Sequence, residues 1–235
     1  MWLGTAVGAQ LNIVPLAQMA MSWRQVIKRL QIWRLVTHVG FVAPLSRYFA
    51  FRLLWLFIYG PPLEQQMTAY NPGEFAFLIL FATVMFNIVY IFYPMGFCGS
   101  ALIFTILYLW SRNFSSQEVS IWGLLNIKAF YLPWAFLGVD LLMGMPMAML
   151  YPDLIGIGIG HLYYFLMSLY PMASGNVILK CPIWLSRYMA QFYGKAASGV
   201  TPPGGGRSSN TRGGGGGGGG GGFRAFQGQG RTLTD

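Results

Sequence analysis

The chain has 235 residues, of which 55% are hydrophobic, 17% aromatic and only 9% charged. Soluble domains carry about 25% charged residues, so this composition excludes an ordinary water-soluble domain. Most side chains do not meet water, which indicates a membrane protein built of α-helices. The two cysteines, Cys98 and Cys181, are too few for a disulfide framework.

Basic residues are concentrated toward the end of the chain, whose formal net charge is +9. From Pro171 onward there are seven Lys/Arg and one Asp, a balance of +6; before Pro171, eight Lys/Arg and five acidic residues give +3. Positive charge beside membrane spans is characteristic of the cytosolic face. We therefore expect the basic tail to be cytosolic.

Six apolar segments are candidates for membrane-spanning helices, which need about 20 apolar residues each. In chain order they are Trp2–Ala20, Tyr48–Tyr59, Glu74–Tyr93, Gly96–Trp110, Ala129–Met147 and Leu154–Leu169. Proline-containing and polar breaks separate them, at Pro61-Pro62, Asn71-Pro72-Gly73, Arg112-Asn113 and Tyr151-Pro152, and the last span is expected to stop at Tyr170-Pro171.

Between the first two spans, basic and aromatic residues alternate at near-helical spacing over Ser22–Thr37. The four cations there are Arg24, Lys28, Arg29 and Arg34. This pattern suits a helix that lies in the membrane interface with its cations reaching the headgroups. If the N-terminus is cytosolic, the loop lies on the far side, where four cations oppose the positive-inside rule. Embedding the loop in the interface reconciles the two.

The segment after the last span changes character twice. Residues 172–195 form a juxtamembrane segment, in which Ile178–Lys195 is amphipathic and expected at the interface. Residues 196–225 are rich in Gly, Ser and Pro, with ten consecutive glycines at 213–222, and cannot bury a core. This linker is expected to be disordered, with an end-to-end distance of about 30 Å. It carries a final peptide, residues 226–233.

Several motifs in this order resemble the Derlin family of rhomboid-like pseudoproteases, over about residues 5–175 and the terminal peptide. The motifs are Gln31–Arg34, Leu63-Glu64, Tyr131–Trp134, Gly156–Phe165, Tyr170-Pro171 and Phe226–Leu233. The resemblance implies a six-helix rhomboid-like membrane domain over residues 1–171, with both termini cytosolic. It also implies the endoplasmic reticulum membrane and non-enzymatic work in endoplasmic-reticulum-associated degradation. In that pathway misfolded proteins return to the cytosol. The resemblance further implies a ubiquitin ligase complex as a partner of this chain, and assembly of the chain into homo- or hetero-oligomers.

The terminal peptide is similar to the SHP box, by which cofactors bind the valosin-containing AAA ATPase. The matching positions are Phe226, Gly228, Gly230 and Leu233. The glycines let the backbone lie close to a receptor, while Phe226 and Leu233 offer apolar anchors. The expected partner of the tail is this ATPase.

Cys98 suggests an alternative, an intramembrane protease. Gly96-Phe97-Cys98-Gly99 stands where rhomboid proteases have Gly-x-Ser-Gly with the nucleophilic serine. A thiol nucleophile needs a base within hydrogen-bond reach. The position of the protease histidine holds Asp153, and His161 follows eight residues later, about 12 Å along a helix. We expect no catalytic residue, cofactor or metal, and keep the Cys98 protease as the alternative.

Two further features have structural or functional interpretations. Trp33-Arg34 matches the Trp-Arg pair of the rhomboid superfamily, with the indole in the interface and the guanidinium anchoring loop and lipid phosphate. Gly156 and Gly160 lie on one helix face and favour close helix packing, and Gly158 is expected to widen that face.

Two ionisable residues lie in or near the spans, Arg52 and Asp140. Charged groups are costly inside a bilayer and usually face protein or water. One interpretation is a polar groove for a translocating substrate chain. The other places both residues near span ends, where their charges reach the lipid headgroups.

Overall fold

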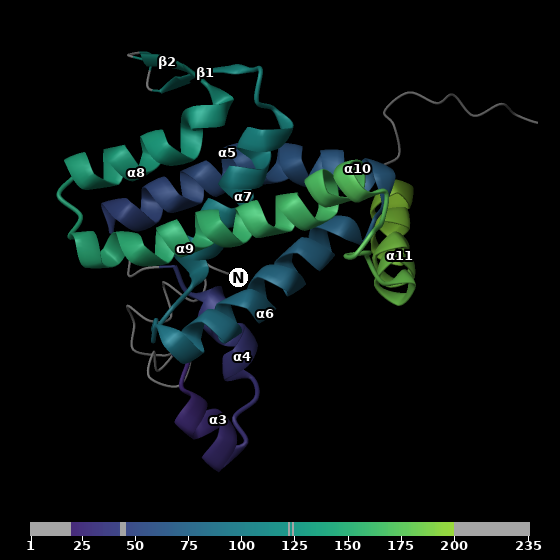
Figure 1. The fold of residues 1–235 in the computed structure, drawn as a ribbon, viewed down its shortest axis with the longest axis horizontal. Helices are drawn as coiled ribbons and strands as arrows, with labels where there is room; N and C mark the ends of the chain where they lie inside the picture. Colours follow the sequence, from purple (N-terminus) through teal and green to yellow (C-terminus); the bar gives the residue numbers. More distant parts are fainter. Residues whose placement is uncertain (1–19, 43–45, 122, 124, 200–235) are drawn as a thin grey trace, which may run out of the picture. The chain divides into compact units, whose positions relative to one another are not determined.

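The structure is a computed structural model that describes residues 20–42, 46–121, 123 and 125–199. The first expected span and the terminal peptide lie outside these residues, apart from Ala20. The described part is mostly helical (Figure 1). Its elements are α3 Trp23–Arg29, α4 Arg34–Thr37, η1 His38–Gly40, α5 Arg47–Tyr70, α6 Glu74–Phe92, α7 Gly99–Asn113, β1 Glu118–Ile121, β2 Leu125–Lys128, η2 Ala129–Tyr131, α8 Leu132–Leu142, α9 Met147–Tyr164, the π-helical η3 Phe165–Leu169, α10 Tyr170–Ser174 and α11 Ile183–Gly199.

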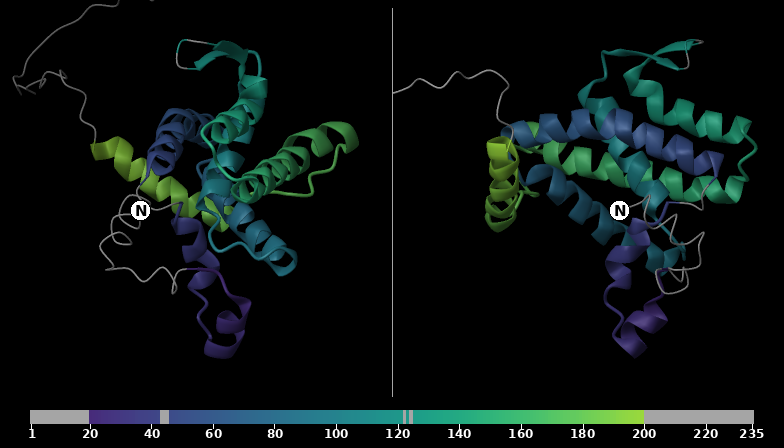
Figure 2. Two further views of the ribbon diagram at one scale, coloured as in Figure 1. Left: turned by 90° about the vertical axis from the view of Figure 1, so that its left-hand side faces the viewer. Right: turned by 180° about the vertical axis from the view of Figure 1, so that it is seen from behind.

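Helix α7 is the centre of the bundle. Twelve of its 15 residues are buried, as expected of a helix that is apolar on every side. It packs chiefly against α9 and α5, with α8 and α6 beside them (Figures 1 and 2). Phe104 of α7 meets Trp55 of α5 edge to face, and Trp55 in turn stacks on Phe136 of α8 at 4.2 Å between ring centroids. Aromatic packing therefore joins three helices.

Glycines on α9 bring its backbone close to that of α7. A Cβ on Gly156 would collide with the carbonyl oxygen of Ala101, and one on Gly160 would lie 3.2 Å from that of Thr105. The Thr105 hydroxyl donates to the Gly156 carbonyl at 2.8 Å. Gly158 faces open space instead, so it does not widen this packing face as expected, because it lies on another side of the helix.

Among the described residues, two helices are long and apolar enough to cross a bilayer, Glu74–Phe92 and Met149–Ser174, and a shorter apolar helix covers Ala129–Leu142. The first matches the expected third span almost residue for residue. The second contains the expected sixth span. The short helix falls within the expected fifth span, where α8 itself has 11 residues.

Two expected proline breaks, Pro61-Pro62 and Tyr151-Pro152, lie inside helices instead. Helix α5 continues through Pro61 and Pro62 to Tyr70. Its far half buries Leu63 completely, and this packing offsets the backbone hydrogen bonds that the prolines remove. Pro152 lies within α9.

The last span also passes its expected stop at Pro171. The π-helical turn Phe165–Leu169 precedes this proline, which falls at the start of α10. A π turn shifts the hydrogen-bond register, and this shift accommodates a residue without an N–H group. The helix ends at Gly175, whose φ of 71° is the left-handed conformation common after helices.

The Ser22–Thr37 segment forms two short helices, α3 and α4, rather than one continuous helix. Leu30, with a φ of 53°, ends α3. The side chains of Ile27 and Trp33 remain 70% and 54% exposed. The apolar and basic character expected of an interfacial loop is thus presented on two short helices.

A small antiparallel hairpin corrects the all-α expectation. Glu118 pairs with Lys128 and Ile121 with Leu125, and Gly123 in the turn has a φ of 74°. Such positive φ values are what tight hairpin turns require. The fold is therefore mostly helical with one two-stranded hairpin between α7 and α8.

Helix α11 is attached to the ends of α5 and α6. The Ser186 hydroxyl donates to Asn71 Oδ1 at 2.7 Å, and the Tyr193 hydroxyl donates to Glu64 Oε1 at 2.5 Å. Burial and the Glu64 hydrogen bond raise the pKa of Tyr193 to about 12. This phenol therefore keeps its proton, and the bond to Glu64, throughout the physiological pH range.

Replacing Gly156 with alanine should lower the thermal unfolding temperature of the purified protein in detergent. The added methyl group collides with the Ala101 carbonyl, and overpacking of this kind costs about 1–3 kcal/mol. Gly158→Ala is the matched control, because its methyl group enters open space. Equal unfolding temperatures for the two variants would contradict the α7–α9 contact.

Candidate functional site

Three charged side chains from three helices meet inside the bundle. Arg52 Nη2 of α5 lies 2.6 Å from Asp153 Oδ2 of α9 and 2.9 Å from Asp140 Oδ2 of α8. The exposed fractions of Arg52, Asp140 and Asp153 are 3%, 2% and 0%. Breaking such a buried pair leaves an uncompensated charge, so each of these residues depends on the others. We call them the charge cluster.

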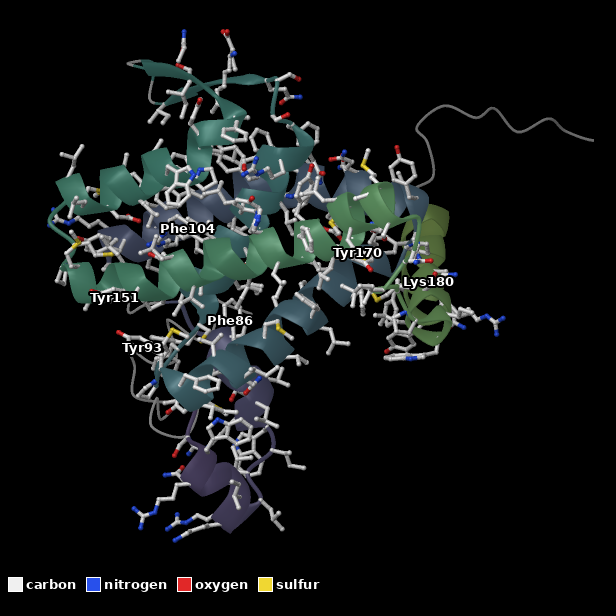
Figure 3. All side chains as sticks on the ribbon, in the orientation of Figure 1. Phe86, Tyr93, Phe104, Tyr151, Tyr170 and Lys180 are labelled. Atoms are coloured by element: carbon white, nitrogen blue, oxygen red, sulfur yellow. The ribbon has the colours of Figure 1, made fainter. Side chains whose placement is uncertain are left out.

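The other side chains that contact the charge cluster lie on α5 and α7. The Ser100 hydroxyl donates to Asp153 Oδ1 at 2.5 Å. The guanidinium carbon of Arg52 lies 5.0 Å from the ring centroid of Trp55 and 4.5 Å from that of Phe104, within the range of cation–π attraction. Figure 3 shows Phe104 in the middle of the bundle. Arg52 Nη1 has no hydrogen-bond partner.

A cavity of about 490 Å³ opens beside the cluster, at the end of the bundle where α5, α7 and α9 begin. Arg52 and Ser100 line it, whereas Asp140 and Asp153 do not. The other lining residues are mostly apolar: Val42, Ser46, Tyr48, Tyr93, Pro94, Met95, Gly96, Phe97, Met145, Met149 and Pro152. A cavity of this kind offers a hydrogen-bond donor within an apolar wall.

These positions contradict the interpretation that Arg52 and Asp140 lie at span ends, whereas the substrate groove stays a prediction. Neither reaches the lipid headgroups, because both side chains are buried and paired. Arg52 lines the cavity, and Asp140 acts only through Arg52. The sequence analysis placed Asp153 at the protease histidine position but missed its ion pair. The presence of two acids and one arginine in the spans was the available signal, since such groups usually pair.

Cys98 is the residue directly before α7. Its side chain is fully buried, and its backbone N–H donates to the His38 carbonyl at 3.0 Å. Both histidines lie in the described residues, and neither shares a hydrogen bond with the thiol. His161 instead pairs with the Tyr108 hydroxyl at 2.7 Å, ten residues or about 15 Å farther along α7.

His38 is held by the first loop. Its Nδ1–H donates to the Arg34 carbonyl at 2.9 Å, and its Nε2 is buried without a partner. Burial lowers the pKa of His38, and the Arg34 hydrogen bond opposes that shift only in part. This imidazole is therefore neutral at physiological pH.

The two residues of the Trp33-Arg34 pair differ in their exposure. Trp33 is 54% exposed, as an interfacial indole would be. Arg34 is buried; it donates to the Ala20 carbonyl at 2.5 Å and to Gln31 Oε1 at 2.7 Å. Its guanidinium therefore holds the loop to its own chain, and the expected contact with lipid phosphate is wrong.

The remaining expectations concern the terminal peptide and metal binding. The terminal positions Phe226, Gly228, Gly230 and Leu233 lie outside the described residues. Within residues 20–42, 46–121, 123 and 125–199, no group of three or more His, Cys, Asp or Glu side chains is arranged to hold a metal ion.

Replacing Arg52 with methionine should destabilise the bundle by about 3–5 kcal/mol, because Asp140 and Asp153 remain buried without a cation. The measurement is thermal unfolding in detergent. Arg47→Met is the matched control, since Arg47 lies exposed at the start of the same helix. Adding Asp140→Asn and Asp153→Asn to Arg52→Met should recover much of the loss. A normal unfolding temperature for Arg52→Met would contradict the cluster.

Comparison with known proteins gives a consistent result. Residues 3–183 match the Der1-like family. The chain is 40% identical to Derlin-1 of Arabidopsis thaliana over 80% of this chain and 70% of that protein. It is 35% identical to Derlin-1 of Oryza sativa subsp. japonica, over 78% and 75%, and 32% identical to Derlin-2.1 of Zea mays, over 79% and 78%. With most of its length matched, and a mostly helical bundle carrying apolar membrane-length helices, the chain belongs to the Der1-like family, the Derlins.

Proposed function

We propose that this chain is a non-enzymatic component of endoplasmic-reticulum-associated degradation. In this proposal it spans the endoplasmic reticulum membrane six times with both termini cytosolic. It helps misfolded proteins pass back to the cytosol and recruits the valosin-containing AAA ATPase through its tail. Membership of the Der1-like family over residues 3–183 is the observation that carries the proposal.

The lengths of the central helices support a passage through a thinned membrane. Helix α7 has 15 residues and α8 has 11, which correspond to about 22 Å and 16 Å. The hydrocarbon core of a bilayer is about 30 Å thick. Short apolar helices are accommodated by local thinning of the bilayer, and a thinner bilayer lowers the barrier for a polar chain.

The cavity beside the charge cluster is a suitable place for a substrate segment. Arg52 Nη1 is a buried donor without a partner, and a peptide carbonyl would satisfy it. The methionines Met95, Met145 and Met149 in the wall adapt to varied apolar side chains, because the thioether is flexible and polarizable. Misfolded substrates have no common sequence, so a binding site for them has to accept different side chains.

The proposal gives Cys98 no chemical role. The thiol is buried, and no histidine is hydrogen-bonded to it. The position of the protease histidine holds Asp153, whose carboxylate is engaged by Arg52 and Ser100. The work on the substrate is therefore assigned to a partner that pulls from the cytosol.

Replacing both Phe226 and Leu233 with alanine should abolish co-purification of the ATPase, because the two apolar anchors of the peptide are lost. Membrane insertion should remain intact, since the substitutions lie outside the apolar segments. Gln227→Ala, between the anchors, is the control and should keep the ATPase. The measurement is immunoprecipitation from mild detergent. Undiminished ATPase in the double variant would sink the recruitment proposal.

A sequon tests the proposed topology. Asn113-Phe114-Ser115 has the acceptor pattern for N-glycosylation. Asn113 ends α7, and with Glu74 and Ser168 it lines one cavity at the end of the bundle from which α10 leads toward α11. A cytosolic tail places this end in the cytosol, so Asn113 should stay unmodified. An endoglycosidase-sensitive mass shift that disappears in Asn113→Gln would show that the topology is inverted.

A further inference from the structure

A second cavity, of about 130 Å³, lies at the end of the bundle opposite the charge cluster. Its walls come from α5, α6, α7 and the segment joining α9 to η3. The polar side chains that line it are Gln66, Tyr70, Glu74, Asn113, Tyr163, Tyr164 and Ser168. Neither the substrate passage nor the ATPase peptide uses this cavity.

Three side chains that line this cavity, from three helices, carry oxygen atoms without a partner among the described residues. The hydroxyl of Tyr163 is buried without a hydrogen bond, and the side chain is only 3% exposed. Gln66 Oε1 is also buried without a partner. Among the residues that the structure describes, no side chain forms a hydrogen bond or ion pair with the Glu74 carboxylate. Unmade hydrogen bonds of buried groups cost about 1–3 kcal/mol each, so the cavity is built for a donor.

Aromatic neighbours and a π-helical turn surround Tyr163. The ring lies 5.4 Å from that of Phe81 and 6.5 Å from that of Phe77, between centroids. Two residues later α9 widens into the π-helical turn Phe165–Leu169, which places Ser168 in the cavity wall. Turns of this kind occur frequently at functional sites.

The charge of the site specifies a single cation. Its lining contains Glu74 and no Lys, Arg or His. Glu74 is the first residue of α6, where the helix dipole favours the ionised carboxylate. A divalent metal prefers several carboxylates. A primary ammonium group carries one charge and three N–H donors, which match the oxygens of Glu74, Gln66 and Tyr163.

Two exposed cations flank the segment that packs on Gly73, the residue before Glu74. Gly73, which precedes Glu74, packs so closely on α11 that a Cβ there would lie 2.7 Å from Ser186 Cα and 3.0 Å from Cys181 Sγ. Lys180 and Arg187 directly flank this Cys181–Ser186 stretch, are exposed, and have no ion-pair partner among the described residues. Figure 3 shows Lys180 at this end of the bundle. The carboxylate of Glu74 and the cations of Lys180 and Arg187 are complementary to a zwitterion, which carries one positive and one negative group.

We propose that this cavity binds the headgroup of phosphatidylethanolamine, with the ammonium on Glu74, Gln66 and Tyr163 and the phosphate toward Lys180 and Arg187. The position at the ends of membrane-length helices puts the site at headgroup level. The bound lipid would join the ends of α5, α6 and α9 to the start of α11. The site is independent of ATPase recruitment, so either proposal can fail alone.

Native mass spectrometry of the purified full chain tests the proposal. The probes are phosphatidylethanolamine, its mono- and dimethyl derivatives and phosphatidylcholine, all with the same acyl chains. Each methyl group removes one N–H donor at constant charge, so retention should fall stepwise. Phosphatidylethanolamine should exceed phosphatidylcholine by about tenfold, since a hydrogen bond to a charged group is worth about 1.5–3 kcal/mol.

Conservative variants assign the effect to the cavity. Glu74→Gln and Tyr163→Phe should each reduce the preference for phosphatidylethanolamine over phosphatidylcholine, and Glu74→Gln should do so more strongly because it also removes the negative charge. Tyr170→Phe removes a phenol from α10 outside the cavity and should leave the preference unchanged. Gln66→Leu tests the third acceptor from another helix. Variants are compared only where their unfolding temperature without added lipid equals that of the unaltered chain.

Two results would overturn the proposal. One is equal retention of phosphatidylethanolamine and phosphatidylcholine by the unaltered chain, which would mean that the cavity holds water or selects no headgroup. The other is an ethanolamine preference that persists in both Glu74→Gln and Tyr163→Phe, which would place the lipid elsewhere.

Discussion

The close approach of α7 and α9 is the contact on which the rest of the bundle depends. Without a side chain at Gly156, the backbone of α9 rests on Ala101, and Thr105 donates to the Gly156 carbonyl. Asp153 lies three residues before this contact, less than one helical turn. It is therefore delivered to Ser100 and Arg52. A small-residue helix contact of the kind common in membranes thus sets the position of the charged site.

The charge cluster fixes the position of Arg52 and also engages Asp153. Arg52 is held by two carboxylates and two aromatic rings, so its buried Nη1 donor has a fixed direction. The same arrangement occupies Asp153, at the position where a protease needs a mobile base beside its nucleophile. Under the proposed function, the bundle binds chains without cutting them, and the force comes from a partner recruited by the tail.

Local patterns in the sequence predicted the helices better than their ends. The apolar run after Gly73 fixed α6 within one residue, because glycine and proline bound it on both sides. The prolines at 61 and 62 misled the prediction, since the burial of Leu63 outweighs a local hydrogen-bond loss. The charge cluster was beyond sequence reasoning in a different way. Its members lie on three helices, and Arg52 and Asp153 are 101 residues apart. The Glu118–Lys128 hairpin was missed because its strands have only four residues each.

Helix α11 links the two halves of the proposed function. It is the last described element before the glycine-rich segment, and it is bound to α5 through Tyr193 and Glu64 and to the α5–α6 turn through Ser186 and Asn71. Net contributions of about 0.5–1.5 kcal/mol for a neutral hydrogen bond and about 1.5–3 kcal/mol for one to a charged group make this attachment modest. Under the proposed function, a pull on the tail acts first on α11 and, through these bonds, on the end of the bundle opposite the charge cluster. Under this proposal, force applied to the ATPase peptide reaches the bundle through α11 and its two hydrogen bonds.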